Sequence, residues 1–358
     1  MTRVHLSRAL FGERERVFLE SDSIQVSLFR YDTGVEAVRI ANTLGYVVVL
    51  PYLGQMVWDA SFAGVRMTMG SMFDAPRPAA MIADTYGCYA FHSGLLRNGN
   101  PGPEDTHAPH GEMPCATMDS AAIVLGADGE GAFVRLTGER EYVRGFGAHY
   151  LAHPSVTLRP GSSLFDIAMS VTNVGGAAMD LMYMCHVNPV FVEDARIVQA
   201  APWTADAVAA RTAIPPHIPA TPEYVALIAD LAAAPGRMEI LDPALPFDPE
   251  QVFYLRNLRT DAAGQTHLML RRPEGDGFLM SYRPDEFPQT VRWLMRNRDV
   301  SVAAFALPAT CRPEGYTAEK RAGRVQSLAP GATREFRVRT GYLDNAAAAA
   351  MDHTIRSL

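Results

Sequence analysis

Short segments of alternating polarity, separated by turn residues, make up most of this chain. In residues 23–31, Ile24, Val26 and Leu28 fall on one face of an extended chain and polar residues fall mainly on the other. This period of two predicts a half-buried β-strand. Residues 163–171, 179–187 and 336–342 are predicted strands of the same kind. The turn-rich residues 172–176 lie between the first two of these, so we expect those two to pair as a hairpin.

Helical patterns are few. Thr221 is a predicted N-cap because Pro222 and Glu223 follow it at the first helical positions. We expect this helix to bury one face and to end near Pro235 and the glycine that follows. The face consists of Tyr224, Leu227, Ile228 and Leu231. A second helix is predicted in the alanine-rich residues 344–357.

Many strands and few helices predict an all-β fold, a large antiparallel β-sandwich. The chain lacks regular β-α-β alternation, which argues against a doubly wound or barrel fold. We expect one sandwich domain over residues 1–343 and a short helical tail over 344–358. Gly126–Gly131 has the composition of a hairpin turn rather than of a phosphate-binding loop.

Composition and charge argue against several classes of protein. The 358 residues are 48% hydrophobic and carry a formal net charge of −7, typical of a soluble globular protein. No apolar run reaches the length of a membrane span, and the arginine-rich start does not resemble a secretory signal, so we expect a cytoplasmic protein that binds no membrane. Four scattered cysteines predict no disulfide framework. Only one of the 32 basic side chains is lysine, which argues against a nucleic-acid partner.

Ionisable side chains gather between residues 91 and 114. This stretch contains His92, Asp105, His107, His110 and Glu112. Histidine exchanges protons near neutral pH and a nearby carboxylate can fix its tautomer, so the cluster suits acid/base catalysis. A solvated, proline-rich loop held by local turns would have the same composition, and both interpretations remain open.

A second candidate lies in a strand. His186 interrupts the otherwise apolar residues 179–187, and Asn188 shares its face two residues later. The histidine is either a hydrogen-bonded core residue or a proton donor facing a pocket. Asn188 could bind a ligand hydroxyl.

Taken together, these stretches resemble the aldose 1-epimerase (galactose mutarotase-like) superfamily, and more closely a largely uncharacterised branch of it. The resemblance covers about residues 6–343 and depends on a set of short motifs. They are Gly54-Gln55 with Trp58, Asp105–Glu112, His186 with Asn188, Phe247–Glu250, and Leu307–Thr310 followed by Glu314–Lys320.

The resemblance implies acid/base interconversion at the anomeric carbon of a free sugar or sugar derivative. By resemblance, His186 protonates the ring oxygen and His110 orients or polarises the same oxygen. The superfamily's catalytic glutamate corresponds to Leu307 here, which cannot accept a proton. The candidate replacements are Glu112, Glu250, Glu314 and Glu319, and we favour Glu112 or Glu314 as catalytic. The alternative for Glu319 to Arg321 is a solvated charged turn.

Sugar sites usually add an aromatic platform and polar groups around the rim. The predicted substrate-binding residues are Gln55, Trp58, His92, Asp105, His107, Asn188, Glu250, Arg292 and Trp293. The expected partner is a small carbohydrate, and the sequence does not indicate an oligomeric state.

Two alternatives remain open. We expect no cofactor, but His107, His110, Glu112 and His186 have the ligand types of a divalent transition-metal site. Such a site would make the protein a metal-assisted sugar isomerase, epimerase or lyase. A protein that binds sugar without catalysis is the other alternative.

Overall fold

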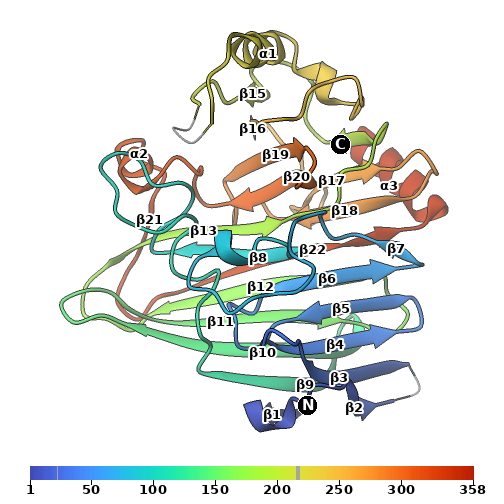
Figure 1. The fold of residues 1–358 in the computed structure, drawn as a ribbon, viewed down its shortest axis with the longest axis vertical. Helices are drawn as coiled ribbons and strands as arrows, with labels where there is room; N and C mark the ends of the chain where they lie inside the picture. Colours follow the sequence, from blue (N-terminus) through green and yellow to red (C-terminus); the bar gives the residue numbers. More distant parts are fainter. Residues whose placement is uncertain (22, 215–217) are drawn as a thin grey trace.

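The computed structural model describes residues 1–21, 23–214 and 218–358 and consists mainly of two large antiparallel sheets (Figure 1). Within those ranges, one sheet has nine strands in the order β1 (Thr2–Leu6), β9 (Ser120–Asp128), β10 (Gly131–Val143), β11 (His149–Leu158), β12 (Leu164–Asn173), β22 (Thr333–Leu343), β18 (Gly277–Tyr282), β17 (Thr266–Arg271) and β14 (Arg196–Gln199).

The second sheet has 13 strands in the described ranges. Its main path is β15 (Val208–Ala210), β16 (Gln251–Leu255), β19 (Gln289–Arg296), β20 (Ser301–Ala309), β13 (Met179–Val187), β8 (Ala90–Leu95), β6 (Val57–Phe62), β5 (Gly45–Val49), β4 (Glu36–Asn42), β3 (Ile24–Arg30) and β2 (Arg16–Glu20). Off this path, β21 (Gln326–Leu328) pairs with β13 and β7 (Val65–Arg66) pairs with β6. The predicted all-β sandwich is confirmed.

Hydrophobic side chains from both sheets form one large buried cluster, which extends along the chain from Leu6 to Tyr342. Alternation along each strand produces it. In β13, Tyr183, Cys185 and Val187 point into this cluster, whereas Met184 belongs to a separate cluster on the other face of the sheet. The outer face of the 13-stranded sheet therefore has its own buried hydrophobic residues, and some of them line the cavity of the candidate site.

The predicted hairpin between residues 163–171 and 179–187 is wrong. Both segments are strands, but β12 lies in the nine-stranded sheet and β13 in the 13-stranded sheet. Residues 174–178 carry the chain from one layer to the other, and β12 pairs instead with β11 and β22. A turn-rich sequence predicts a change of direction but does not specify the layer in which the next strand pairs. The hairpin predicted at Gly126–Gly131 is confirmed, because β9 and β10 pair across it.

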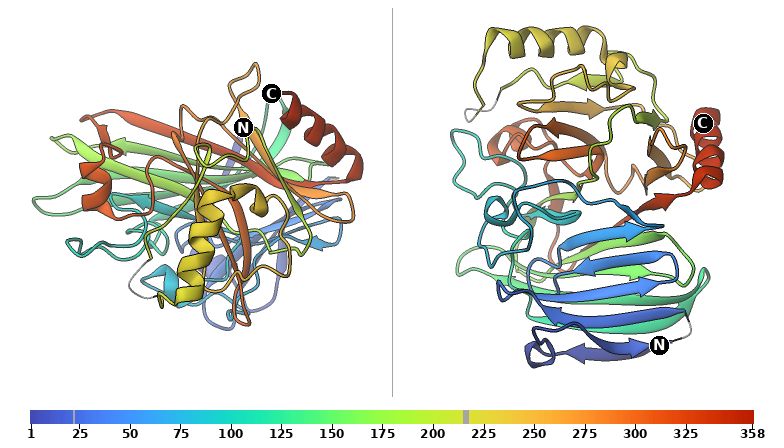
Figure 2. Two further views of the ribbon diagram at one scale, coloured as in Figure 1. Left: turned by 90° about the horizontal axis from the view of Figure 1, so that it is seen from above. Right: turned by 45° about the vertical axis from the view of Figure 1, so that its right-hand side comes forward.

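Both predicted helices are present. Helix α1 (Pro222–Ala233) begins at Thr221, whose side chain accepts a hydrogen bond from the Tyr224 amide, and α3 (Asn345–Ser357) begins at the Asp344 cap. Figure 2 shows α1 at one end of the molecule and α3 beside the nine-stranded sheet, where α3 packs against β14, β17 and β22. No helix among the described residues has the length and apolar character that a bilayer crossing requires.

Four shorter elements complete the described helices. They are η1 (Arg8–Leu10), η2 (Ile82–Thr85), η3 (Pro235–Met238) and α2 (Tyr316–Arg321). The interpretation of residues 319–321 as a solvated charged turn is wrong for Glu319, which is fully buried; all three residues lie in α2, and Lys320 and Arg321 are exposed. Its carboxylate accepts two hydrogen bonds from the Arg324 guanidinium and one from the Arg312 amide. All four cysteines are buried and free, as expected.

Candidate functional site

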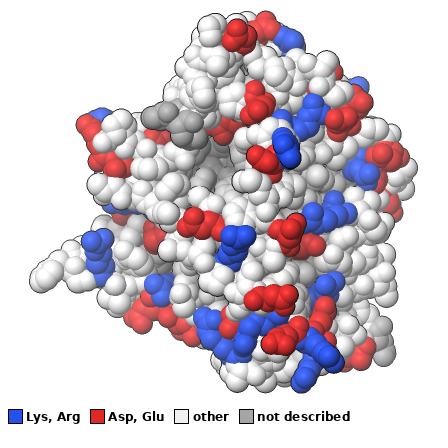
Figure 3. All heavy atoms as spheres, in the orientation of Figure 1, with Lys and Arg blue, Asp and Glu red and all other residues white. Residues whose placement is uncertain are grey.

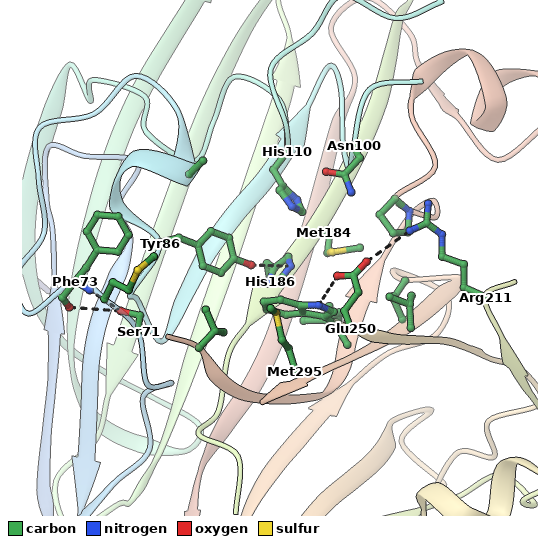
Figure 4. A pocket seen from close by; sticks show the side chains of 18 residues that line it. Ser71, Phe73, Tyr86, Asn100, His110, Met184, His186, Arg211, Glu250 and Met295 are labelled. Carbon is green, nitrogen blue, oxygen red and sulfur yellow. Dashed lines mark hydrogen bonds and ion pairs between the residues drawn. The ribbon is translucent and has the colours of Figure 1, made fainter. Parts of the chain in front are cut away.

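A cavity of about 330 Å³ lies on the outer face of the 13-stranded sheet, over β13, β16, β19 and β20. The segment around Ser71 to Tyr86 borders it on one side, and Asn100 and His110 border it from the loop after β8. Figure 3 shows that the molecule is hollowed on the face seen in Figure 1, below the end that contains α1. Figure 4 shows the side chains that line the cavity.

His186 lines the cavity near the end of β13, and its ring is held through Asn188. The Asn188 amide nitrogen donates to the Cys88 carbonyl at 3.2 Å, so its oxygen faces His186 Nδ1 at 2.8 Å. Nδ1 must therefore carry the proton and donate it to that oxygen. The free position is Nε2, which lies 3.4 Å from the Tyr86 hydroxyl (Figure 4). His186 can accept or transfer a proton through Nε2 alone.

His110 reaches the cavity from the loop through an unusual backbone conformation. Its φ is +62°, and the following Gly111 has a φ of +82°. A Cβ atom on residue 111 would lie 2.0 Å from the Arg97 carbonyl oxygen, so glycine is required there. Strained backbone of this kind is often found at functional sites.

Hydrogen bonds also fix the tautomer of His110. The Ser93 hydroxyl donates to the Asn98 side-chain oxygen, so it accepts a hydrogen bond from His110 Nδ1 at 3.0 Å. In the neutral ring, Nε2 then carries a lone pair. It can accept a hydrogen bond from a sugar hydroxyl, but it has no proton to donate to a ring oxygen.

The two imidazoles meet in the cavity. The ring centroids of His110 and His186 are 5.1 Å apart and the rings are nearly perpendicular, at 85°. Phe91 stacks on His186 with centroids 4.5 Å apart. Burial lowers the pKa of His110 to about 4, with a smaller contribution from His107, and burial together with His110 holds the pKa of His186 well below its usual value. Both rings are neutral at pH 7.

Glu250 supplies a carboxylate to the same cavity from the residue just before β16. The Trp293 indole nitrogen donates to Glu250 Oε2 at 2.7 Å, and Arg211 Nη1 lies 3.8 Å from Oε1 (Figure 4). Arg211 makes a two-point ion pair with Glu314, which also accepts from the Tyr254 hydroxyl. Of the two carboxylates, Glu250 lines the cavity, whereas Glu314 does not line it and is bound to Arg211.

Leu307 also lines the cavity, near the C-terminal end of β20. It is paired with Val291 of β19, and Val291 is paired in turn with Tyr254 of β16. The position that the resemblance matches to a catalytic glutamate therefore faces the cavity but is apolar. The carboxylate in the cavity comes instead from near β16, two strands away.

Glu112, one of the two favoured carboxylates, does not line the cavity. Its Oε1 accepts hydrogen bonds from the Leu95 and Leu96 amides at 2.9 and 2.7 Å and from the Tyr150 hydroxyl at 2.9 Å. Tyr150 belongs to β11 in the opposite sheet. These bonds direct Glu112 toward the space between the sheets, so its placement does not fit the predicted catalytic role.

His92 and Arg292 were predicted to bind substrate, but strand alternation directs both toward the interior. His92 Nδ1 lies 2.8 Å from the Tyr183 hydroxyl, and burial lowers the pKa of His92 to about 3. Arg292 is fully buried, bonded to the Phe305 carbonyl and to Gln199. Their strand neighbours Phe91 and Trp293 lie on the cavity face instead.

Asp105 and His107 hold the loop in place. Asp105 accepts hydrogen bonds from the Thr317 amide and hydroxyl, which ties the loop to α2. His107 lies 3.8 Å from the Asp105 carboxylate, and its Nδ1 is directed at the Ala108 carbonyl. Neither residue lines the cavity.

Gln55 and Trp58 are buried away from the cavity lining. Trp58 packs in a hydrophobic cluster that also contains Cys88 and Phe91, next to the cavity. Of the predicted residues, four line the cavity together: His110, His186, Glu250 and Trp293. Asn188 does not line it but is hydrogen-bonded to His186.

The residues of the alternative metal site do not converge in the same way. His110 and His186 meet, but His107 and Glu112 are directed at the groups described above. Among the described residues, no group of three or more His, Cys, Asp or Glu side chains is arranged to hold a metal ion.

Sequence reasoning missed Tyr86, Asn100 and Arg211, all of which line the cavity. Tyr86 follows η2, and its ring makes edge contacts with Phe91, His186 and Trp293. No motif marks these positions. The three residues lie in loop segments that only the fold brings next to the cavity.

The two-sheet sandwich with a cavity on one face is a galactose mutarotase-like fold. A protein from Klebsiella pneumoniae, provisionally described as an aldose 1-epimerase, has a similar structure with a TM-score of 0.80, 16% identity, and coverage of 99% of this chain and 95% of its own. A galactose mutarotase-like protein from Clostridium acetobutylicum has a TM-score of 0.59 and 12% identity, with coverage of 90% and 99%. At such identities the likeness concerns the fold alone.

The chain belongs to the family described as "Domain of unknown function (DUF4432)", whose model matches residues 32–341. A search of curated proteins gave no match. These comparisons confirm the galactose mutarotase-like fold that the resemblance implies, and the matching family is one of unknown function, as expected for an uncharacterised branch.

Proposed function

We propose that this protein is an isomerase that uses acid/base catalysis at the anomeric carbon of an uncharged free sugar or sugar derivative. The observation that carries the proposal is the meeting of His110 and His186, with ring centroids 5.1 Å apart, in a cavity that Glu250 also lines. These groups come from three distant stretches of the chain. Their convergence in a cavity of about 330 Å³ fits a small ligand.

The polar groups of the cavity match the hydroxyl groups of a sugar. The Nε2 atoms of both imidazoles and the Glu250 carboxylate accept hydrogen bonds, whereas Asn100 and Arg211 can donate them. Each sugar hydroxyl both donates and accepts. A cavity rich in acceptors therefore suits a polyhydroxylated ligand better than an anionic one.

In the proposed reaction, Glu250 takes the proton of the anomeric hydroxyl while the bond between C1 and the ring oxygen breaks. The reactive form is the minor imidazolium fraction, in which His186 carries a proton on Nε2 as well as on Nδ1; it gives the Nε2 proton to the ring oxygen, which leaves an open-chain aldehyde. Rotation about the C1–C2 bond and reversal of both transfers close the ring with the opposite configuration. His110 accepts a hydrogen bond from a neighbouring hydroxyl and orients the sugar.

Glu250 is the carboxylate best placed for the role of base. Glu314 is bound on both oxygens by Arg211, and Glu112 is directed between the sheets. The Trp293 bond to one oxygen of Glu250 fixes its direction while the other oxygen faces the Arg211 side of the cavity. This assignment replaces the preference for Glu112 or Glu314 that the sequence alone indicates.

Saturation-transfer NMR tests the proposal directly, because it measures the exchange rate between the α and β anomers of each aldose. The protein should accelerate exchange for at least one sugar in a panel of aldoses and deoxyaldoses. His186→Ala should reduce the rate by about 10²-fold or more. His153→Ala is the matched control, since His153 lies on the surface and its Nε2 is 3.2 Å from Glu139 Oε2. Binding without acceleration, unchanged in His186→Ala, would indicate a sugar-binding protein instead.

A further inference from the structure

We infer that the substrate is an uncharged deoxy sugar, with a methyl or methylene group where a common hexose has a hydroxyl. The inference rests on the proposed function and adds the substrate class. It comes from the floor of the cavity, which is apolar across four adjacent strands. The floor residues are Met184, Val252, Val291, Met295, Val300 and Leu307.

The floor is continuous with a cluster of buried hydrophobic residues. Met184, Val291 and Leu307 belong to this cluster together with Val302, Ala304 and Ala309 beneath and beside them. Strand register explains the continuity. Leu307 is paired with Val291 of β19, and two residues further on Ala309 is paired with Met184 of β13. Leu307 therefore lies between side chains of both neighbouring strands on one face of the sheet.

The polar groups lie on the walls of the cavity instead. His110 and Asn100 come from the loop after β8, Tyr86 follows η2, and Arg211 follows β15. A sugar that presents hydroxyls to these walls must turn its remaining edge toward the floor. The floor strands also contribute His186 and Trp293 to the lining. The Trp293 indole nitrogen donates its hydrogen bond to Glu250, so it is not available to a sugar hydroxyl.

A hydroxyl on that edge would lose its hydrogen bonds to water and find methyl and thioether groups in their place. A methyl or methylene group would pack there without this cost. Apolar pockets discriminate against an added hydroxyl by up to about 10²-fold. We therefore expect a preference of about 10- to 100-fold for the deoxy sugar over its parent.

The charges around the cavity favour an uncharged ligand. Arg211, which is the cation among the described lining residues, is bound through two nitrogens to Glu314 and lies 3.8 Å from Glu250. The guanidinium is therefore already paired with carboxylates. A phosphate or carboxylate on the sugar would have to displace Glu314 or be repelled by Glu250.

The experiment compares sugars that differ in one hydroxyl. The pairs are 6-deoxyglucose with glucose, 2-deoxyglucose with glucose, and fucose with galactose, in both enantiomeric series where available. Anomer exchange by NMR gives kcat/KM, and a calorimetric titration gives Kd. For the best pair, kcat/KM and affinity should both be at least about tenfold higher for the deoxy sugar. Equal or better performance of the parent hexose overturns the inference but leaves the proposed function in place.

The failure of the proposed function gives a different result. A deoxy sugar that binds at least tenfold more tightly than its parent, without accelerated exchange, supports the substrate class and overturns the isomerase. No binding and no acceleration for any sugar overturns both.

Val291→Thr tests the floor itself with little change in volume. It should reduce the preference for the deoxy sugar about tenfold, because its hydroxyl offers a partner to the parent sugar. Val302→Thr is the matched control, since Val302 is buried in the same cluster but does not line the cavity. A preference that changes equally in both variants would contradict the inference.

Discussion

His110 and His186 are 76 positions apart in the sequence, yet their rings meet edge to face with centroids 5.1 Å apart. The loop after β8 brings one ring and β13 the other, and β8 pairs directly with β13. Ser93 of β8 holds His110, and Phe91 of the same strand stacks on His186. Adjacent strands thus fix both imidazoles relative to each other, which is the preorganisation that acid/base catalysis requires.

Glu250→Gln should abolish most of the proposed activity. Glutamine keeps the acceptor for the Trp293 indole but cannot take a proton, so we expect kcat to fall by about 10²- to 10³-fold with an unchanged fold. Saturation-transfer NMR and circular dichroism provide the two measurements. Glu239→Gln is the control, because Glu239 forms an ion pair with Arg196 away from the cavity. Full activity in Glu250→Gln would assign the base to another group.

The proposed acid predicts the sign of the pH dependence. Burial and His110 hold the pKa of His186 well below 6.5, so the protonated form becomes rarer as pH rises. If His186 must be protonated, kcat/KM should increase by up to about tenfold per unit as pH falls from 8 to 6. A profile that is flat between pH 6 and 8 would mean that His186 acts in its neutral form.

Glu112→Gln should affect stability rather than chemistry. The carboxylate accepts three hydrogen bonds through one oxygen, two of them from backbone amides. Replacing the charged acceptor should lower the free energy of unfolding by about 1–3 kcal/mol, measured by urea denaturation. The kcat of the folded enzyme should stay within about twofold of the unmodified protein. A loss of activity without a loss of stability would restore Glu112 as a catalytic candidate.

Glu319→Gln tests the ion pair between the buried Glu319 of α2 and Arg324, which follows the helix. Its carboxylate is fully buried and paired with Arg324, which is 27% exposed. Removing the charge should therefore cost about 3 kcal/mol of unfolding free energy. Glu104→Gln is the matched control, since its pair with Arg321 is exposed on both sides and should contribute less than about 1 kcal/mol. Equal effects in the two variants would contradict the role assigned to Glu319.

The sequence predicts local structure better than the arrangement of the layers. Alternating polarity and the Thr221 cap correctly indicate strands and α1, because these signals depend on neighbouring residues. The pairing of β12 with β22 instead of β13 depends on contacts about 170 positions apart. A turn motif carries no information about such contacts.

The same limit applies to the site. His110 and His186 are recognisable because each lies in a short motif, and Glu250 ends the motif 247–250. Glu112 lies only two residues after His110 in the sequence. However, His110 and Gly111 have positive φ values that turn the backbone, so the Glu112 side chain is directed to the other side of the sheet. Proximity in sequence was therefore misleading, and Tyr86 and Arg211 could be found only in three dimensions.

The central claim is that His110 and His186 contact one sugar in one cavity, and NMR of the imidazole groups tests it most directly. Histidine ring signals, assigned with His110→Gln and His186→Gln, are followed while the best sugar of the panel is added. Both rings should shift with the same Kd, whereas the surface ring of His153 should not move. Shifts in one ring alone, or in neither while the sugar binds, would contradict a shared site.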